Sequence, residues 1–148
     1  MHDCLLSSKS NEWETPIDLF EALNSEFGFT IDAAATSENA KLPRYFTQSD
    51  DGLSKSWKGE RVWCNPPYGR EIGRWIEKAA TCDADLVVLL IPARTDTKAW
   101  HEFILNKAEV RFIRGRLKFT KSGGAKNPAP FPSALVVFRF TQPFRLRS

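Results

Sequence analysis

The stretch "DLVVLLIP", residues 85 to 92, is the part of the sequence that most restricts the fold. It carries no charged residue after Asp85 and is apolar on both faces. A strand of this kind is stable only where other elements cover both of its faces, as in the centre of a parallel sheet. We therefore expect a central parallel strand that ends at Pro92.

A helix is predicted ahead of this strand, where apolar residues recur at helical spacing. These are Ile17, Phe20, Leu23 and Phe27. We expect Thr15 as its N-cap, Pro16 at its first position and Asp18 in the capping-box place, and Gly28 ends the pattern.

The rest of the chain alternates between extended and helical patterns. The predicted elements are strands 29–32 and 61–65, a helix carrying Ile72, Trp75, Ile76 and Ala79, a helix from Asp96 or Thr97 to Leu105, and the strands "EVRFI" and "ALVVFRF" around the loop "KSGGAKNPAPFPS". Such alternation indicates an α/β fold with helices on both faces of a mostly parallel sheet. Ligands of such sheets bind beyond the carboxyl ends of the strands, where Asp32 and Asn65 stand.

Length and composition limit the class of protein. The 148 residues suit one compact domain. The longest purely apolar run is far shorter than the roughly 18 residues of a membrane span, and the first ten residues lack a signal pattern. We therefore expect no membrane span. The three cysteines have neither disulfide-framework nor zinc spacing, so we also expect no metal and a reducing cytoplasmic location.

The charge is unevenly distributed along the chain. Residues 1–102 contain 17 acids and 11 bases, whereas residues 103–148 contain 10 bases and the single acid Glu109. This cationic third is either a solvated basic surface or a side that faces a polyanion, and composition does not decide between the two.

The sequence "VWCNPPYGR" places Asn65, Pro66, Pro67 and Tyr68 directly after a predicted buried strand. The Asn65 side-chain carbonyl and the Pro66 peptide carbonyl can accept both hydrogens of an aromatic amine, and the prolines keep the corner rigid. Tyr68 offers a face for stacking an extruded base, and Gly69 lets the chain pass close by. The alternative is a polyproline-like surface ligand for a recognition domain.

At this point the sequence resembles the short phage-type DNA N6-adenine methyltransferases that use S-adenosylmethionine. The matching segments are "ETPIDLF", "IDAAAT", "NAKLPRYFT", "DDGLSKSW", "VWCNPPYG", "IPARTDT", "GRLKF" and "APFPSALVVF". They run from about Glu14 to Phe138, which is nearly the whole chain. The resemblance implies a Rossmann-like methyltransferase fold in a compact single domain, residues 1–148, without a separate target-recognition domain.

The resemblance also implies roles for individual residues. Asn65 to Tyr68 would form the catalytic corner, and the segments holding S-adenosylmethionine would be Thr15 and Pro16 for the methionine carboxylate, Asp32, Ala33 and Ala34 for the methionine end, and Asp50 or Asp51 for the adenine amine. The usual glycine-rich turn is absent, and "DAAATSENA" stands in its place. Glu38 and Asn39 are candidates for the ribose contact.

Each acid has an alternative role in the structure. Asp32 at a strand end is often a helix cap, and Asp50-Asp51-Gly52 is also typical of an ordinary turn. The resemblance favours a cofactor role for these acids.

The segment "RLKFT" pairs charge with an aromatic residue in the cationic third. Arg116, Lys118 and Phe119 suit phosphate contact and base stacking, or else an edge strand protected by its charges. The loop that follows is long, basic and rich in glycine and proline, which favours either a mobile cover over a substrate channel or a segment that orders on DNA.

These patterns together predict an S-adenosylmethionine-dependent methyltransferase acting on adenine N6 in double-stranded DNA. Two alternatives stay open. One is methylation of another planar amine or amide, such as an RNA base or a protein glutamine. The other is a catalytically silent DNA-binding protein that keeps the fold.

Overall fold

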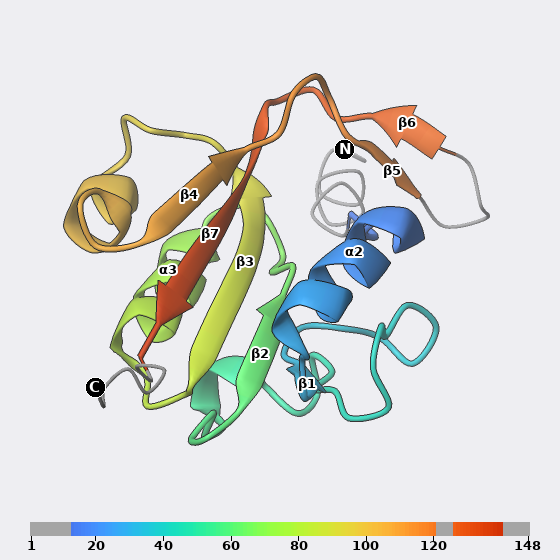
Figure 1. The fold of residues 1–148 in the computed structure, drawn as a ribbon, viewed down its shortest axis with the longest axis vertical. Coiled ribbons are helices and arrows are strands. Elements are labelled where there is room, and N and C mark those ends of the chain that lie inside the picture. Colours follow the sequence, from blue (N-terminus) through green and yellow to red (C-terminus); the bar gives the residue numbers. More distant parts are fainter. Residues whose placement is uncertain (1–12, 121–125, 141–148) are drawn as a thin grey trace, which may run out of the picture.

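A computed structural model of the protein describes residues 13–120 and 126–140 (Figure 1). A five-stranded sheet has the order β1-β2-β3-β7-β4, and β5 and β6 form a separate hairpin. The elements are α2 (Ile17–Phe27), β1 (Ile31–Asp32), η1 (Gly52–Ser54), β2 (Arg61–Cys64), α3 (Ile72–Thr81), β3 (Leu86–Pro92), η2 (Trp100–Ile104), β4 (Glu109–Phe112), β5 (Lys118–Thr120), β6 (Lys126–Pro128) and β7 (Ser133–Arg139).

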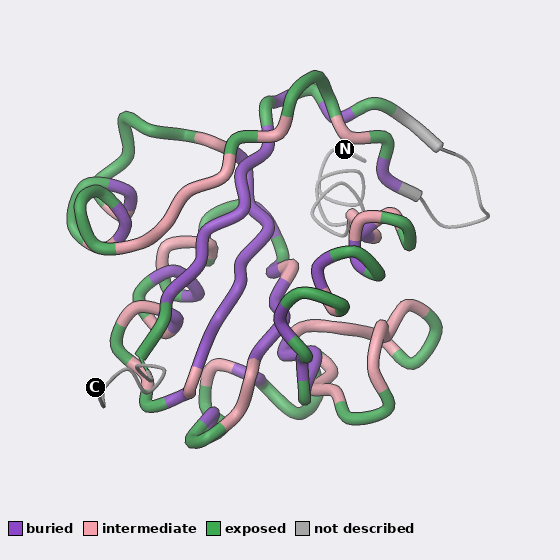
Figure 2. Tube along the Cα trace, viewed as in Figure 1, coloured by how far each residue is buried: buried purple, intermediate pink, exposed green. Residues whose placement is uncertain are grey.

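The predicted central strand is β3, and all seven of its residues are buried (Figure 2). It runs parallel to β2 and antiparallel to β7. The expectation of a parallel strand therefore holds on the β2 side only, because burial on both faces does not specify the direction of a neighbour. Since β4 is antiparallel to β7, four of the five strands of the sheet point the same way.

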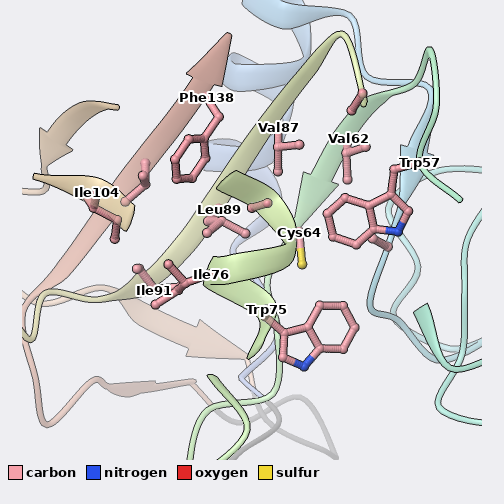
Figure 3. Packing of buried hydrophobic residues seen from close by; sticks show 14 of the residues in the cluster. Trp57, Val62, Cys64, Trp75, Ile76, Val87, Leu89, Ile91, Ile104 and Phe138 are labelled. Carbon is pink, nitrogen blue, oxygen red and sulfur yellow. The ribbon is translucent and has the colours of Figure 1, made fainter. Parts of the chain in front are cut away.

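Alternate residues of β3 enter two separate apolar layers. Leu86, Val88 and Leu90 pack with α2, whereas Val87 and Leu89 pack with α3 and η2. Figure 3 shows the second layer, in which the side chains of α3 lie over those of the sheet. Because side chains alternate along a strand, one apolar run supplies both layers, and helices cover both faces as predicted.

Helix α2 forms where the sequence predicts it but begins without the predicted cap. No side chain caps its N-terminus, and the Thr15 hydroxyl bonds elsewhere. Ile17 is 52% exposed and lies outside the buried stripe. At the other end Gly28, at φ 64°, donates to the Asn24 carbonyl, the left-handed ending that glycine allows.

The C-terminal part differs from prediction in two places. The helix expected from 96 or 97 to 105 is a short π-helical segment, η2, and the Thr97 hydroxyl accepts from the Trp100 N–H at its start. The expected long loop contains β6, which pairs with β5, so the connection between strands is shorter than expected. Its residues 121–125 lie outside the described residues. Within the described ranges, no helix has the length and apolar character needed to span a membrane.

Candidate active site

A cavity of about 350 Å³ lies at the carboxyl ends of β1 and β2. These strands are parallel, with Asp32 opposite Trp63, so the residues that follow them are neighbours. The predicted site residues that line the cavity are Thr15, Asp32, Ala33, Ala34, Asn39, Asp51, Asn65 and Pro67. The predicted site residues that do not line it are Pro16, Glu38, Asp50, Pro66, Tyr68, Gly69, Arg116, Lys118 and Phe119.

The Asn65 amide is held by the segment that precedes α2. Its Nδ2 donates to the carbonyl of Trp13 and, at 2.9 Å, to the Thr15 hydroxyl. A peptide carbonyl only accepts, so the Trp13 contact identifies the nitrogen of the amide. The other atom, Oδ1, is buried and has no hydrogen-bond partner among the described residues. An unsatisfied buried acceptor costs roughly 1–3 kcal/mol, which a donor on a ligand would recover once the atoms that cover Oδ1 move aside.

Tyr68 anchors the other end of the corner to the central strand. Its hydroxyl donates to the Leu90 carbonyl at 3.0 Å. Burial raises the pKa of Tyr68 far above its usual value, so the hydroxyl stays protonated and remains a donor. The corner from Asn65 to Tyr68 is thus fixed at both ends by hydrogen bonds.

The Tyr68 ring lies in an aromatic cluster. Phe119 and Phe131 meet it edge to face at 6.5 and 5.6 Å between ring centroids, and Trp13 packs against both of these rings. Tyr68 is only 6% exposed, so a base reaches its face only if these neighbours move. Phe119 has no exposed area. In this conformation it offers no face to a base, because alternation along β5 turns it inward while Lys118 faces out.

Asp32 holds the loop that follows β1. Its Oδ1 accepts from the Ala34 N–H at 3.3 Å and its Oδ2 from the Lys41 N–H at 3.0 Å. Burial raises the pKa of Asp32 to about 6, and these two N–H groups oppose the rise. No helix begins at Asp32. The carboxylate therefore shapes a cavity wall instead of capping a helix.

The neighbouring acids Asp50 and Asp51 have different surroundings. Asp50 Oδ2 accepts from the Thr47 N–H at 2.8 Å and from the Thr47 hydroxyl at 3.1 Å, and these bonds lower the pKa of Asp50. Asp51 lines the cavity instead, with its backbone at φ 58°. Of the two candidates, Asp50 closes a turn and Asp51 is the residue that lines the cavity.

Gly52 allows this part of the wall to close. A Cβ on Gly52 would lie 2.4 Å from the Ala33 carbonyl oxygen, a distance that real side chains do not adopt. The close approach brings η1 against the turn after β1. The segments "DAAAT" and "DDGLS" thus approach closely at Ala33 and Gly52, and the absence of a side chain on Gly52 makes this approach possible.

Several cavity residues were not identified from the sequence. They are Trp13, Glu14, Ala35, Thr36, Lys41, Thr47, Gln48, Gly52, Trp63, Glu71 and Trp75. Lys41 Nζ lies 3.3 Å from Glu14 Oε2, which joins the loop after β1 to the segment before α2. Asn39, a predicted ribose contact, already accepts from the Thr36 N–H at 2.8 Å. No local pattern signals these residues, because they come from separate segments, before α2, after β1, in β2 and in α3, that only the fold brings together.

The cationic third is partly neutralised within the protein. Arg111 pairs with Glu26 and Glu109, and Arg139 also pairs with Glu109. Arg116 and Lys118 are exposed on the β5 side and stand apart from the cavity lining. They remain candidates for contact with a large anionic partner.

The cysteine next to the corner is not a nucleophile. Cys64 is a free, fully buried thiol, and burial together with the nearby Asp32 raises the pKa of Cys64 well above its usual value. Over residues 13–120 and 126–140, no three His, Cys, Asp or Glu side chains are placed to hold a metal ion.

Comparison with known proteins gives the family. The model of the family "DNA N-6-adenine-methyltransferase (Dam)" matches residues 4–147. A DNA N-6-adenine-methyltransferase of Escherichia phage T1 is 31% identical over 110 residues, which are 71% of this chain and 45% of the phage protein. The protein of the same name from Haemophilus phage HP1 is 26% identical over 145 residues, 93% of this chain and 83% of its own length. The chain therefore belongs to the DNA N-6-adenine-methyltransferase (Dam) family.

Proposed function

We propose that the chain transfers a methyl group from S-adenosylmethionine to the N6 amine of adenine in double-stranded DNA. The observation that carries the proposal is the buried, unpartnered Oδ1 of Asn65 in a residue that lines the cavity at the ends of β1 and β2. Family membership supports the same reaction.

The proposal includes a Rossmann-like methyltransferase fold for the sheet and helices of the described residues. Four co-directional strands and helices on both faces support it. We also propose a cytoplasmic location, where a DNA substrate and S-adenosylmethionine would both be available.

The cavity fits S-adenosylmethionine in size and in chemistry. Its volume of about 350 Å³ falls within the range of small-molecule sites. Asp51 can accept from the adenine amine, Trp75 supplies an apolar wall, and Thr15 can donate to the carboxylate. When bound there, the cofactor supplies a methyl group on a positively charged sulfur.

Asn65 and Pro66 orient the amine that is methylated. The nitrogen lone pair of an aromatic amine is delocalised into the ring, so the free amine is a weak nucleophile. The Asn65 Oδ1 and the Pro66 carbonyl accept from its two hydrogens and draw the nitrogen toward a tetrahedral form. The same two acceptors stabilise the positive charge that develops on N6, which is the main contribution of the protein together with positioning.

Incubation with labelled S-adenosylmethionine and unmethylated duplex DNA, followed by digestion to nucleosides, tests the proposal. We expect the label in N6-methyladenine. Label in RNA nucleosides or in protein glutamine instead would reassign the substrate. Calorimetry without heat of S-adenosylmethionine binding would identify a catalytically silent protein.

A further inference from the structure

The segment before α2 and the catalytic corner are joined by a hydrogen bond between residues 50 positions apart. The Thr15 hydroxyl accepts from Asn65 Nδ2 at 2.9 Å, and Thr15 is only 3% exposed. The remaining hydrogen of the same nitrogen goes to the Trp13 carbonyl. Both hydrogens of the Asn65 amide are thus held by one three-residue segment.

This arrangement fixes the side of the amide on which Oδ1 lies. If the amide turned over, Oδ1 would face the Trp13 carbonyl, and two acceptors repel each other. The bond to Thr15 adds a second point of attachment, which sets the angle of the amide plane. Groups that hold a reacting side chain in this way raise activity by orientation, without contact with the substrate.

The helix offers no competing explanation for Thr15. Helix α2 has no side-chain cap, so the hydroxyl is not used there. Thr15 also lines the cavity, and a hydroxyl that accepts one hydrogen bond still has a proton to donate. A cofactor contact and the bond to Asn65 are therefore compatible with each other.

We propose that Thr15 is a positioning residue, whose hydroxyl holds the Asn65 amide so that Oδ1 meets the N6 amine of adenine. This inference rests on the proposed function. It adds to the cofactor role of Thr15 a separate effect on the rate of methyl transfer.

Two substitutions separate this role from cofactor binding and from packing. Thr15→Val keeps the shape and removes the hydroxyl, whereas Thr15→Ser keeps the hydroxyl and removes a methyl group. With cofactor and DNA both saturating, we expect kcat to fall at least about tenfold in Thr15→Val and to stay within about threefold of the original in Thr15→Ser. An unchanged kcat in Thr15→Val, or equal losses in both variants, would overturn the inference.

A spectroscopic measurement observes the hydrogen bond directly. In ¹⁵N-labelled protein, the Asn65 side-chain amide signal is assigned from its loss in Asn65→Ala. We expect this signal to move in Thr15→Val and to keep its position in Thr15→Ser. Coincident signals in the original protein and in Thr15→Val would contradict a bond to Thr15.

The two proposals fail in different ways. If the original protein methylates no adenine, the proposed function is wrong, and the amide signal still shows whether Thr15 holds Asn65. If it methylates adenine and Thr15→Val is equally fast, only the positioning role is wrong.

Discussion

The hydroxyl of Tyr68 donates a 3.0 Å hydrogen bond to the carbonyl of Leu90, which ties the corner from Asn65 to Tyr68 to the central strand. Both groups are buried. The bond fixes the end of the corner opposite Asn65, so the corner is positioned by the most deeply buried strand of the sheet.

Removal of this hydroxyl should destabilise the protein modestly. Tyr68→Phe leaves the Leu90 carbonyl without its donor, so the free energy of unfolding should fall by roughly 1–3 kcal/mol. Urea denaturation measures this change. Methyl transfer should persist in Tyr68→Phe, since the ring stays in place. A variant as stable as the original would show that the hydrogen bond contributes nothing.

The buried carboxyl of Asp32 should make stability depend on pH. Burial raises the pKa of Asp32 from 3.8 to about 6, so between these values the folded protein binds more protons than the unfolded chain. The contribution of Asp32 to the free energy of unfolding therefore falls as pH rises through this interval. The total change from this one group is up to about 3 kcal/mol.

Comparison with Asp32→Asn isolates the effect, because the other acids titrate in both proteins. Urea denaturation from pH 4 to about 7 should show the original protein losing stability relative to Asp32→Asn as pH rises. A difference that stays constant over the range would contradict the raised pKa.

The two adjacent acids should differ in their effect on cofactor binding. Asp51→Asn removes the charge while asparagine tolerates the left-handed backbone, so we expect S-adenosylmethionine affinity to fall about tenfold. Asp50→Asn should change affinity by less than about threefold, because that side chain bonds to Thr47. Isothermal calorimetry compares the pair. Equal losses of affinity in the two variants would show that both acids contact the cofactor, and no loss in either would show that neither does.

The exposed cations of the β5 side should contribute to DNA affinity through phosphate contacts. Replacing Arg116 and Lys118 by glutamine should reduce the slope of log affinity against log salt by about 2. Arg74→Gln is the control, since Arg74 is exposed and pairs with Glu71 on the α3 side. An unchanged slope with weaker solubility would favour the protective edge-strand role instead.

Local patterns predicted the elements that form the two layers. The apolar run of β3 and the helical spacing in α3 specify burial and period, and both elements form at the expected places. The direction of β7 was not predictable, because alternation describes which face is buried and says nothing about strand order. The family was also identified correctly from its motifs, and the comparisons confirm it.

The site residues were harder to assign, because their roles depend on contacts distant in sequence. Thr-Pro before a helix is a typical cap signal, yet the Thr15 hydroxyl bonds to Asn65. Phe119 lies between basic residues, a pattern that suits stacking on a nucleic-acid base. In the structure, however, the hairpin packs Phe119 against Tyr68. Sequence alone also left Asp50 and Asp51 as equal candidates for the cofactor contact. In the structure they differ because Asp50 accepts from the Thr47 N–H and closes a turn.

The central claim concerns one atom, the side-chain oxygen of Asn65, and methyl transfer by Asn65→Ala under single-turnover conditions tests it most directly. Cofactor affinity, measured alongside, should stay within about threefold of the original. We predict a rate of adenine methylation at least about a hundredfold lower than that of the original protein. An Asn65→Ala protein that methylates adenine at the original rate would contradict the account.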